Sequence, residues 1–213
     1  MGIKTQRPPI KETIGAQYVC FNKMSVDGEW TNQFEEEVEK TETVKSVKVT
    51  ENSSATDVHA SGKVYMSDNS TESVNIESEV IAFVQETLAK MKGEVVDEGG
   101  LVIAAGNDVR PYFAYGKVVK LKNNKIRMEW FPKCQLSENT DETKTSEASF
   151  SEQTDTITIK AYDFDGAGHC KVYVDSSMAN YPAGLTEDMF FSKPILTPAD
   201  LAAVISAASQ TTS

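Results

Sequence analysis

The chain has 213 residues, of which 39% are apolar and 25% charged, a composition that can form a globular core. Its 32 acidic and 21 basic side chains give a formal net charge of −11 at pH 7. A surface of that sign repels phosphates, which excludes tight binding to nucleic acid. No apolar run is longer than five residues, the length of Leu101–Ala105, far fewer than the ~20 that span a bilayer, so we expect no membrane partner.

The N-terminal third predicts an extended arm followed by strands. Residues 1–13 contain Pro8 and Pro9 and show no periodicity, which predicts an arm that needs a partner to become ordered. The aromatic-rich segment 14–23 predicts a strand, the dipeptide Asp27-Gly28 a turn, and a second strand should begin near Trp30.

A long hairpin and a helix are predicted next. Alternation late in segment 34–50 and again over 58–67 indicates two strands, and the polar cluster 51–56 between them is typical of a mobile hairpin tip. A stripe of apolar residues at helical spacing then predicts a helix over about 76–92 that covers a sheet, with Gly93 as its C-terminal stop. The stripe consists of Ile76, Val80, Phe83, Val84, Leu88 and Met91.

The second half of the chain predicts two further hairpins. Segments 112–122 and 126–136 flank Asn123-Asn124, and asparagine tolerates the left-handed conformation of tight hairpin turns. Residues 137–152 are polar and predict a flexible loop or an exposed strand extension.

The second of these hairpins lies near the C-terminus. Segments 156–164 and 169–175 alternate around Asp165-Gly166, a dipeptide that favours a hairpin turn.

A short helix is predicted at the C-terminus. Thr197 suits the N-cap, Pro198 the first helical position and Asp200 the third. The sequence leaves open whether this helix packs on its own subunit, on a neighbour or on another protein.

Candidate chemistry is sparse, and we expect neither an enzyme nor a metal or cofactor site. The segment Asp163–His169 resembles the start of a calcium loop, but Val174 stands where the bidentate Glu is required. His59 and His169 belong to no zinc pattern, and nucleophile-elbow and phosphate-loop motifs are missing. The three cysteines, which are predicted to be buried free thiols, indicate assembly in a reducing cytoplasm. They are Cys20, Cys134 and Cys170.

The order and spacing of several segments resemble the phi13-like family of major tail proteins of long-tailed, non-contractile bacteriophages, which build the tail tube. The resemblance covers about residues 14–175. Its segments are YMSDN at 65–69, LAKMKG at 88–93, DVRPYFAYGK at 108–117, IRMEWFPKCQL at 126–136 and ETKTSEASFSEQTDTITIKAYD at 142–163.

This resemblance implies a mainly β (α+β) fold, a β-sandwich or barrel-like domain with one flanking helix and a short C-terminal helix. The N-terminal arm (1–13), the β domain (14–194) and the C-terminal helix and tail (195–213) would be its parts. It implies homohexameric rings that stack into a hollow tube in the virion, assembled in the bacterial cytoplasm, with no catalytic residue. Tape-measure, tail-terminator and distal tail proteins would be its partners, and phage DNA would pass through the lumen without specific binding.

Candidate contacts between subunits lie in segments that we expect to become ordered only between neighbours. They are Pro8, Pro9, Glu51, Asn52, Ser53, Thr143, Lys144, Thr145, Leu201 and Val204. The alternative function is a β-sandwich module that binds a carbohydrate or a cell surface, in which Trp30, Trp130 and Tyr181 would stack on a sugar ring.

Overall fold

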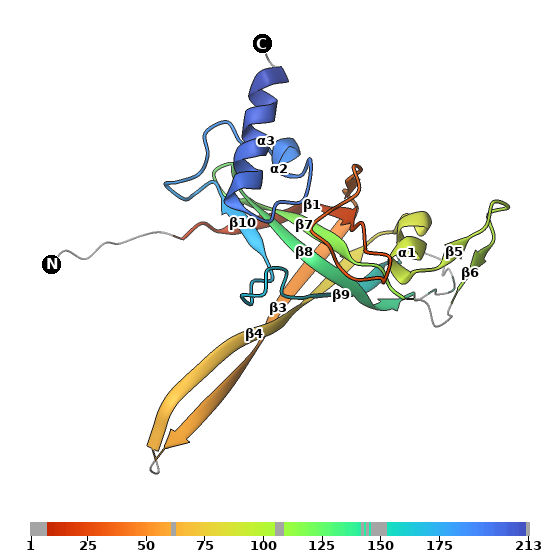
Figure 1. Ribbon diagram of the computed structural model, residues 1–213. Helices are drawn as coiled ribbons and strands as arrows, with labels where there is room; N and C mark the ends of the chain where they lie inside the picture. Colours follow the sequence, from red (N-terminus) through yellow and green to blue (C-terminus); the bar gives the residue numbers. More distant parts are fainter. Residues whose placement is uncertain are drawn as a thin grey trace.

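An antiparallel sheet dominates the computed structural model of the chain, which describes residues 8–60, 63–104, 109–141, 143, 145 and 153–211. The sheet has eight strands in the order β2-β1-β7-β8-β9-β4-β3, with β10 also paired to β8 (Figure 1). These strands are β1 (Lys11–Phe21), β2 (Glu39–Thr41), β3 (Val44–Ala60), β4 (Lys63–Val80), β7 (Phe113–Leu121), β8 (Lys125–Thr140), β9 (Asp155–Ala161) and β10 (Val172–Asp175).

A small hairpin and short helices complete the described part of the chain. The hairpin consists of β5 (Val95–Val96) and β6 (Val102–Ile103), and the helices are α1 (Gln85–Lys92), α2 (Glu187–Phe190) and α3 (Pro198–Thr211). The expectation of a mainly β fold with few helices is therefore confirmed.

The sheet curls so that its two ends approach each other across the inner face. Ser78 Oγ of β4 donates a hydrogen bond to Gln17 Oε1 of β1 at 2.7 Å, although three strands, β7, β8 and β9, lie between β1 and β4 in the sheet. Aromatic and branched side chains from β1, β4, β7, β8 and β9 fill the inner face, and Leu88 and Met91 of α1 pack against them. This inner core holds the sheet in its barrel-like curve.

The C-terminal segment covers the outer face of the sheet. Phe191, just after α2, stacks on Tyr18 of β1 with ring centroids 3.8 Å apart, and Trp130 of β8 donates from Nε1 to the Phe190 carbonyl at 3.2 Å. Leu201 and Ile205 of α3 pack against the same cluster. Helix α3 therefore docks on its own subunit, which answers a question that the sequence left open.

The predicted turn and helix ends are confirmed where they depend on neighbouring residues alone. Asn123 and Asn124 have φ angles of 63° and 58°, as a tight turn between β7 and β8 requires. Gly93 ends α1 with φ 76°. At the start of α3, Asp200 N donates to Thr197 Oγ1 at 3.2 Å and Thr197 N donates to Asp200 Oδ2 at 2.9 Å, a reciprocal capping box.

The helix and the hairpin tip differ from expectation. Ile76 and Val80 belong to β4, where they face the inner core, so the flanking helix covers only Gln85–Lys92 and not 76–92. The polar cluster 51–56 is no tip: β3 continues to Ala60, which pairs with Lys63. Residues 61–62 between them lie outside the described residues.

The second hairpin of the C-terminal half is not formed. Strand β9 pairs with β8 and β4, and β10 pairs with β8 alone. The two run in the same direction along one edge of β8, because Ala161 is opposite Cys134 and Val172 is opposite Trp130. The loop 162–171 thus interrupts one edge instead of closing a hairpin.

Two smaller boundaries also differ. No strand begins near Trp30, where the described chain makes only an isolated bridge between Asn22 and Phe34 before β2. At the N-terminus, β1 starts at Lys11, which pairs with Leu121, so the strand begins three residues inside the segment 1–13 that was expected to be an arm.

Candidate interaction surfaces

The feature that stands apart from the body of the molecule is an arm formed by the outer halves of β3 and β4. Strand β9 pairs with β4 only between Val74 and Val80. Beyond Val74 the pairing of β3 with β4 continues to Ala60 and Lys63, and the hairpin projects far from the sheet (Figure 1). We call residues 53–60 and 63–71 the β3–β4 arm. In the described part of the chain, no third strand pairs with it.

Polar cross-strand contacts hold the base of the arm to the body. Lys48 Nζ lies 3.2 Å from a Glu77 carboxylate oxygen across the β3–β4 pair. Ser46 Oγ donates to Glu79 Oε2, also at 3.2 Å. Glu51 forms an ion pair with Lys171, which precedes β10. The base is therefore held by the fold, whereas further out no strand of the described ranges pairs with the arm.

The candidate contact residues lie in separate places. Pro8 and Pro9 are exposed before β1, and Thr143 and Thr145 are exposed beyond β8. Glu51, Asn52 and Ser53 are exposed on β3 where the arm begins, and not at its tip. Lys144 lies outside the described residues.

The last two candidates belong to α3. Leu201 is half-buried, and Val204 is buried against its own subunit. Val204 therefore packs within its own subunit, and its role as a contact between subunits stays a prediction.

An ion pair is buried on the inner face near the polar end of the core. Lys117 Nζ of β7 lies 3.1 Å from Glu129 Oε2 of β8, and each side chain is only 10% exposed. Burial holds the pKa of Lys117 below its usual value, although the Glu129 carboxylate opposes the shift. Next to it, Gln17 Oε1 accepts from both Ser78 and Tyr115, while Gln17 Nε2 is buried without a partner. Because the two charges satisfy each other, this pair supports the fold and offers no free acid or base.

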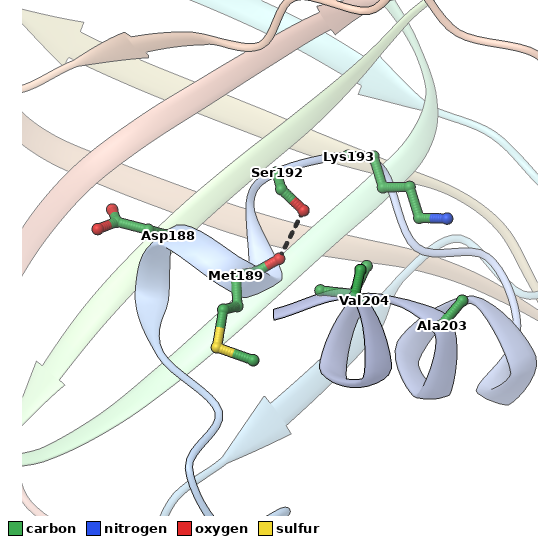
Figure 2. A pocket seen from close by; sticks show the side chains of 7 residues that line it. Asp188, Met189, Ser192, Lys193, Ala203 and Val204 are labelled. Atoms are coloured by element: carbon green, nitrogen blue, oxygen red, sulfur yellow. Dashed lines mark hydrogen bonds between the residues drawn. The ribbon is translucent and has the colours of Figure 1, made fainter. Parts of the chain in front are cut away.

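A hollow of about 470 Å³ lies between α2 and α3. Figure 2 shows Met189 and Val204 at its centre, with Asp188 and Lys193 at opposite sides. The Ser192 hydroxyl donates a hydrogen bond to the Met189 carbonyl at 2.8 Å. Among the residues that line this hollow, no base contacts the serine, so the arrangement does not support nucleophilic catalysis.

The loop 162–171 uses its carboxylates internally. Asp163 Oδ1 accepts from the backbone N–H groups of Asp165 and Gly166, each at 3.0 Å, and Asp165 Oδ2 lies 2.6 Å from His169 Nδ1. The bond to Asp165 raises the pKa of His169, and the pKa of Asp165 falls to about 2. Within the described ranges, no group of three potential ligands is arranged to hold a metal ion.

The three aromatic residues of the carbohydrate-binding alternative do not form one platform. Trp130 is fully buried under Phe191, so it cannot stack on a ligand. Tyr181 is half-buried and donates its hydroxyl to the Leu185 carbonyl at 2.7 Å. Trp30 is half-buried, with the ammonium of Lys133 5.2 Å from its ring centroid.

The cysteines are buried, as the sequence predicts. Burial raises the pKa of Cys20 to about 12 and that of Cys134 well above its usual value. Both thiols therefore stay protonated and unreactive at neutral pH.

One surface was missed by the sequence analysis. The β5–β6 hairpin carries Val95, Val96, Leu101, Val102 and Ile103, all of them exposed. The signal was present in the sequence, because these residues form apolar runs without polar alternation on either side of Gly99-Gly100. Such a run normally predicts a buried strand.

A comparison with known protein families and with curated proteins finds no match to this sequence. In the described segments, no helix is both long and apolar enough to cross a membrane.

Proposed function

We propose that this chain is a structural subunit of a bacteriophage tail tube, which assembles into stacked homohexameric rings. The β3–β4 arm is the observation that carries this proposal. From Ser53 to Ala60 the arm extends by eight residues, about 26 Å at ~3.3 Å per strand residue.

An arm of this kind is expected to be unstable in a monomer in solution. A two-stranded hairpin without a third strand or a packed face is at best marginally stable in water. Its unpaired edges are also templates for pairing with another chain. Burial of the arm by neighbouring subunits on assembly would explain why the chain has so long a hairpin.

Charge supports the same proposal. Six chains of −11 give a ring a formal charge of −66, six times the value of one chain. Where part of that charge faces a lumen, the phosphate backbone of DNA is repelled from the wall and passes without binding. The buried, protonated thiols suit assembly in the reducing cytoplasm of a bacterial host before incorporation into the virion.

The proposal also sets the expected partners. Copies of this chain would supply both ring contacts and ring-to-ring contacts, and tape-measure, tail-terminator and distal tail proteins would contact the ends of the tube. No cofactor takes part.

Electron microscopy of the concentrated protein tests the proposal. A matched variant joins Ser53 to Thr71 through Asn-Gly, which removes the arm at a cross-strand pair and restores a two-residue turn. We expect rings with a central hole or tubes from the unmodified chain, and only monomers or single rings from the shortened one.

The melting temperature is the control for folding, because the shortened variant keeps both cores and should melt within a few degrees of the parent. Tubes formed equally well without the arm, or a parent that remains monomeric at high concentration, would contradict the proposal. A saturable rise in melting temperature with a glycan, in the absence of assembly, would instead indicate the carbohydrate-binding module.

A further inference from the structure

The β5–β6 hairpin is apolar on both faces. Val95 pairs with Ile103 and Val96 pairs with Val102, and neighbouring cross-strand pairs point to opposite faces. All four side chains, and that of Leu101 in the turn, are between 41% and 65% exposed. Five of the exposed large hydrophobic residues of the described chain thus fall within nine consecutive positions.

This hairpin is unlike a normal solvated loop. Its strands have two residues each, and the main sheet does not extend to it. Two short strands without a packed face do not hold together well in water. Contiguous exposed apolar side chains mark a surface that another molecule covers.

An apolar pocket lies elsewhere on the molecule, between β10 and the C-terminal segment. It has a volume of about 190 Å³, and Val172, Val174, Phe190, Ile195 and Leu201 contribute to its lining. Tyr173 of β10 also lines it and is 47% exposed. Strand β10 pairs with β8 on one side, and no described strand pairs with its other edge. The pocket therefore adjoins an open sheet edge.

The hairpin and the pocket complement each other. A cavity of ~150 Å³ accommodates a benzene-sized apolar group, so this pocket can hold one or two aliphatic side chains. A strand of the hairpin can pair with the open edge of β10 while its side chains enter the pocket.

A chain cannot fill its own pocket with its own hairpin. In Figure 1, β5 and β6 lie at the right of the molecule, beyond α1, whereas β10 and α3 lie at the left. A hairpin that enters this pocket must therefore belong to a second copy of this chain.

We propose that the β5–β6 hairpin of one copy docks into the β10–α3 pocket of the next, with Ile103 inserted and a hairpin strand along the free edge of β10. The contact is heterologous, so each copy uses both surfaces and the series continues in one direction until it closes. Closure into a six-membered ring rests on the proposed function, whereas the contact itself rests on these two surfaces.

Cysteine cross-linking between two singly substituted proteins tests the contact. We expect Ile103→Cys mixed with Tyr173→Cys to form a disulfide-linked dimer under mild oxidation at least ten times faster than Val26→Cys mixed with Tyr173→Cys. Val26 is a suitable control because it is fully exposed. The native cysteines are buried and compete little.

A second variant tests the same contact without a disulfide. Ile103→Asp should lower association at least tenfold by sedimentation velocity and leave the melting temperature unchanged, because the side chain is largely exposed in the single subunit. Val26→Asp, matched in chemistry, should associate like the parent.

The outcomes separate this contact from the tail-tube proposal. Rings that form with no preferential cross-link overturn the contact and leave the tube intact. A preferential cross-link in open chains without rings supports the contact and contradicts hexameric rings. A parent that does not self-associate at any concentration overturns both.

Discussion

The backbone of Gly116 lies against the ring of Phe191. A methyl group on the Gly116 Cα would come within 2.7 Å of Phe191 Cε1 and within 3.0 Å of two ring atoms of Trp130. This close approach lets Phe191 lie flat on Tyr18, with 3° between the ring planes. A glycine in the middle of β7 therefore determines how the C-terminal segment docks on the outer face.

Gly116→Ala should destabilise the subunit by about 1–3 kcal/mol, the usual cost of overpacking a well-filled core. The added methyl displaces Phe191, and the stack on Tyr18 is lost with it. Urea unfolding measures the change. Gly99→Ala is the matched control, because its added Cβ would meet only Asp97 Oδ2 at 3.5 Å, and its effect should remain within about 0.5 kcal/mol. Equal changes in the free energy of unfolding of the two variants would show that Phe191 moves aside without destabilising the fold.

Lys117→Met should destabilise the fold by about 3–5 kcal/mol, because it leaves the Glu129 carboxylate buried without its partner. The double variant Lys117→Met/Glu129→Leu should recover most of that loss, since both charges are then replaced by apolar groups. Chemical unfolding of the two single variants and the double variant gives the coupling free energy. Additive effects would contradict a coupled pair.

The same ion pair predicts a pH effect. The pKa of Lys117 is lowered in the folded chain by burial, so the unfolded chain binds more protons between the lowered and the ordinary value. Stability contributed by this group should rise with pH across that window. The difference between the parent and the double variant, followed by unfolding between pH 7 and 10, isolates the effect. A difference that falls as pH rises would contradict it.

His169 should titrate above the usual histidine value in NMR, since its ring is hydrogen-bonded to Asp165. A raised folded-state pKa gives stability that is fully present below the unfolded value, and that stability is lost as pH rises through the folded value. Asp165→Asn removes the carboxylate and should return the His169 pKa toward normal. An unchanged His169 titration in this variant would show that Asp165 is not the cause.

Thr197→Ala should destabilise the start of α3 by about 1 kcal/mol, because it removes the acceptor for Asp200 N. Amide hydrogen exchange along α3 measures the local loss, and the melting temperature measures the global one. Ser206→Ala is the control in the same helix, since its hydroxyl only donates back to the Ala202 carbonyl at 2.9 Å. Equal exchange in both variants would contradict a stabilising cap.

Several errors of the sequence analysis come from patterns that fit two structures. Ile76 and Val80 are four residues apart, which places them on one face of a helix and also on one face of a strand. Pairing of β4 with β9 decided for the strand. Glu51–Thr56 lacks alternation of apolar and polar residues because the hairpin begins to leave the core there. The sequence pattern that normally predicts a strand is therefore missing.

The sequence alone determined those features whose energy is local. The Asn123-Asn124 turn, the Gly93 stop and the Thr197 cap follow from backbone conformation and hydrogen bonds between near neighbours, and the negative charge follows from composition. The tight turn around Asp165-Gly166 also forms locally, with Phe164 N donating to the His169 carbonyl at 3.1 Å.

Only the tertiary structure decided which strands pair. Strand β8 has 16 residues, so one of its edges has room for both β9 and β10 in succession. The two strands therefore pair with β8 and not with each other. The exposed β5–β6 hairpin, the open edge of β10 and the unsupported β3–β4 arm are likewise products of the whole sheet. Strand pairing is set by contacts between residues far apart in sequence, which periodicity along the chain does not encode.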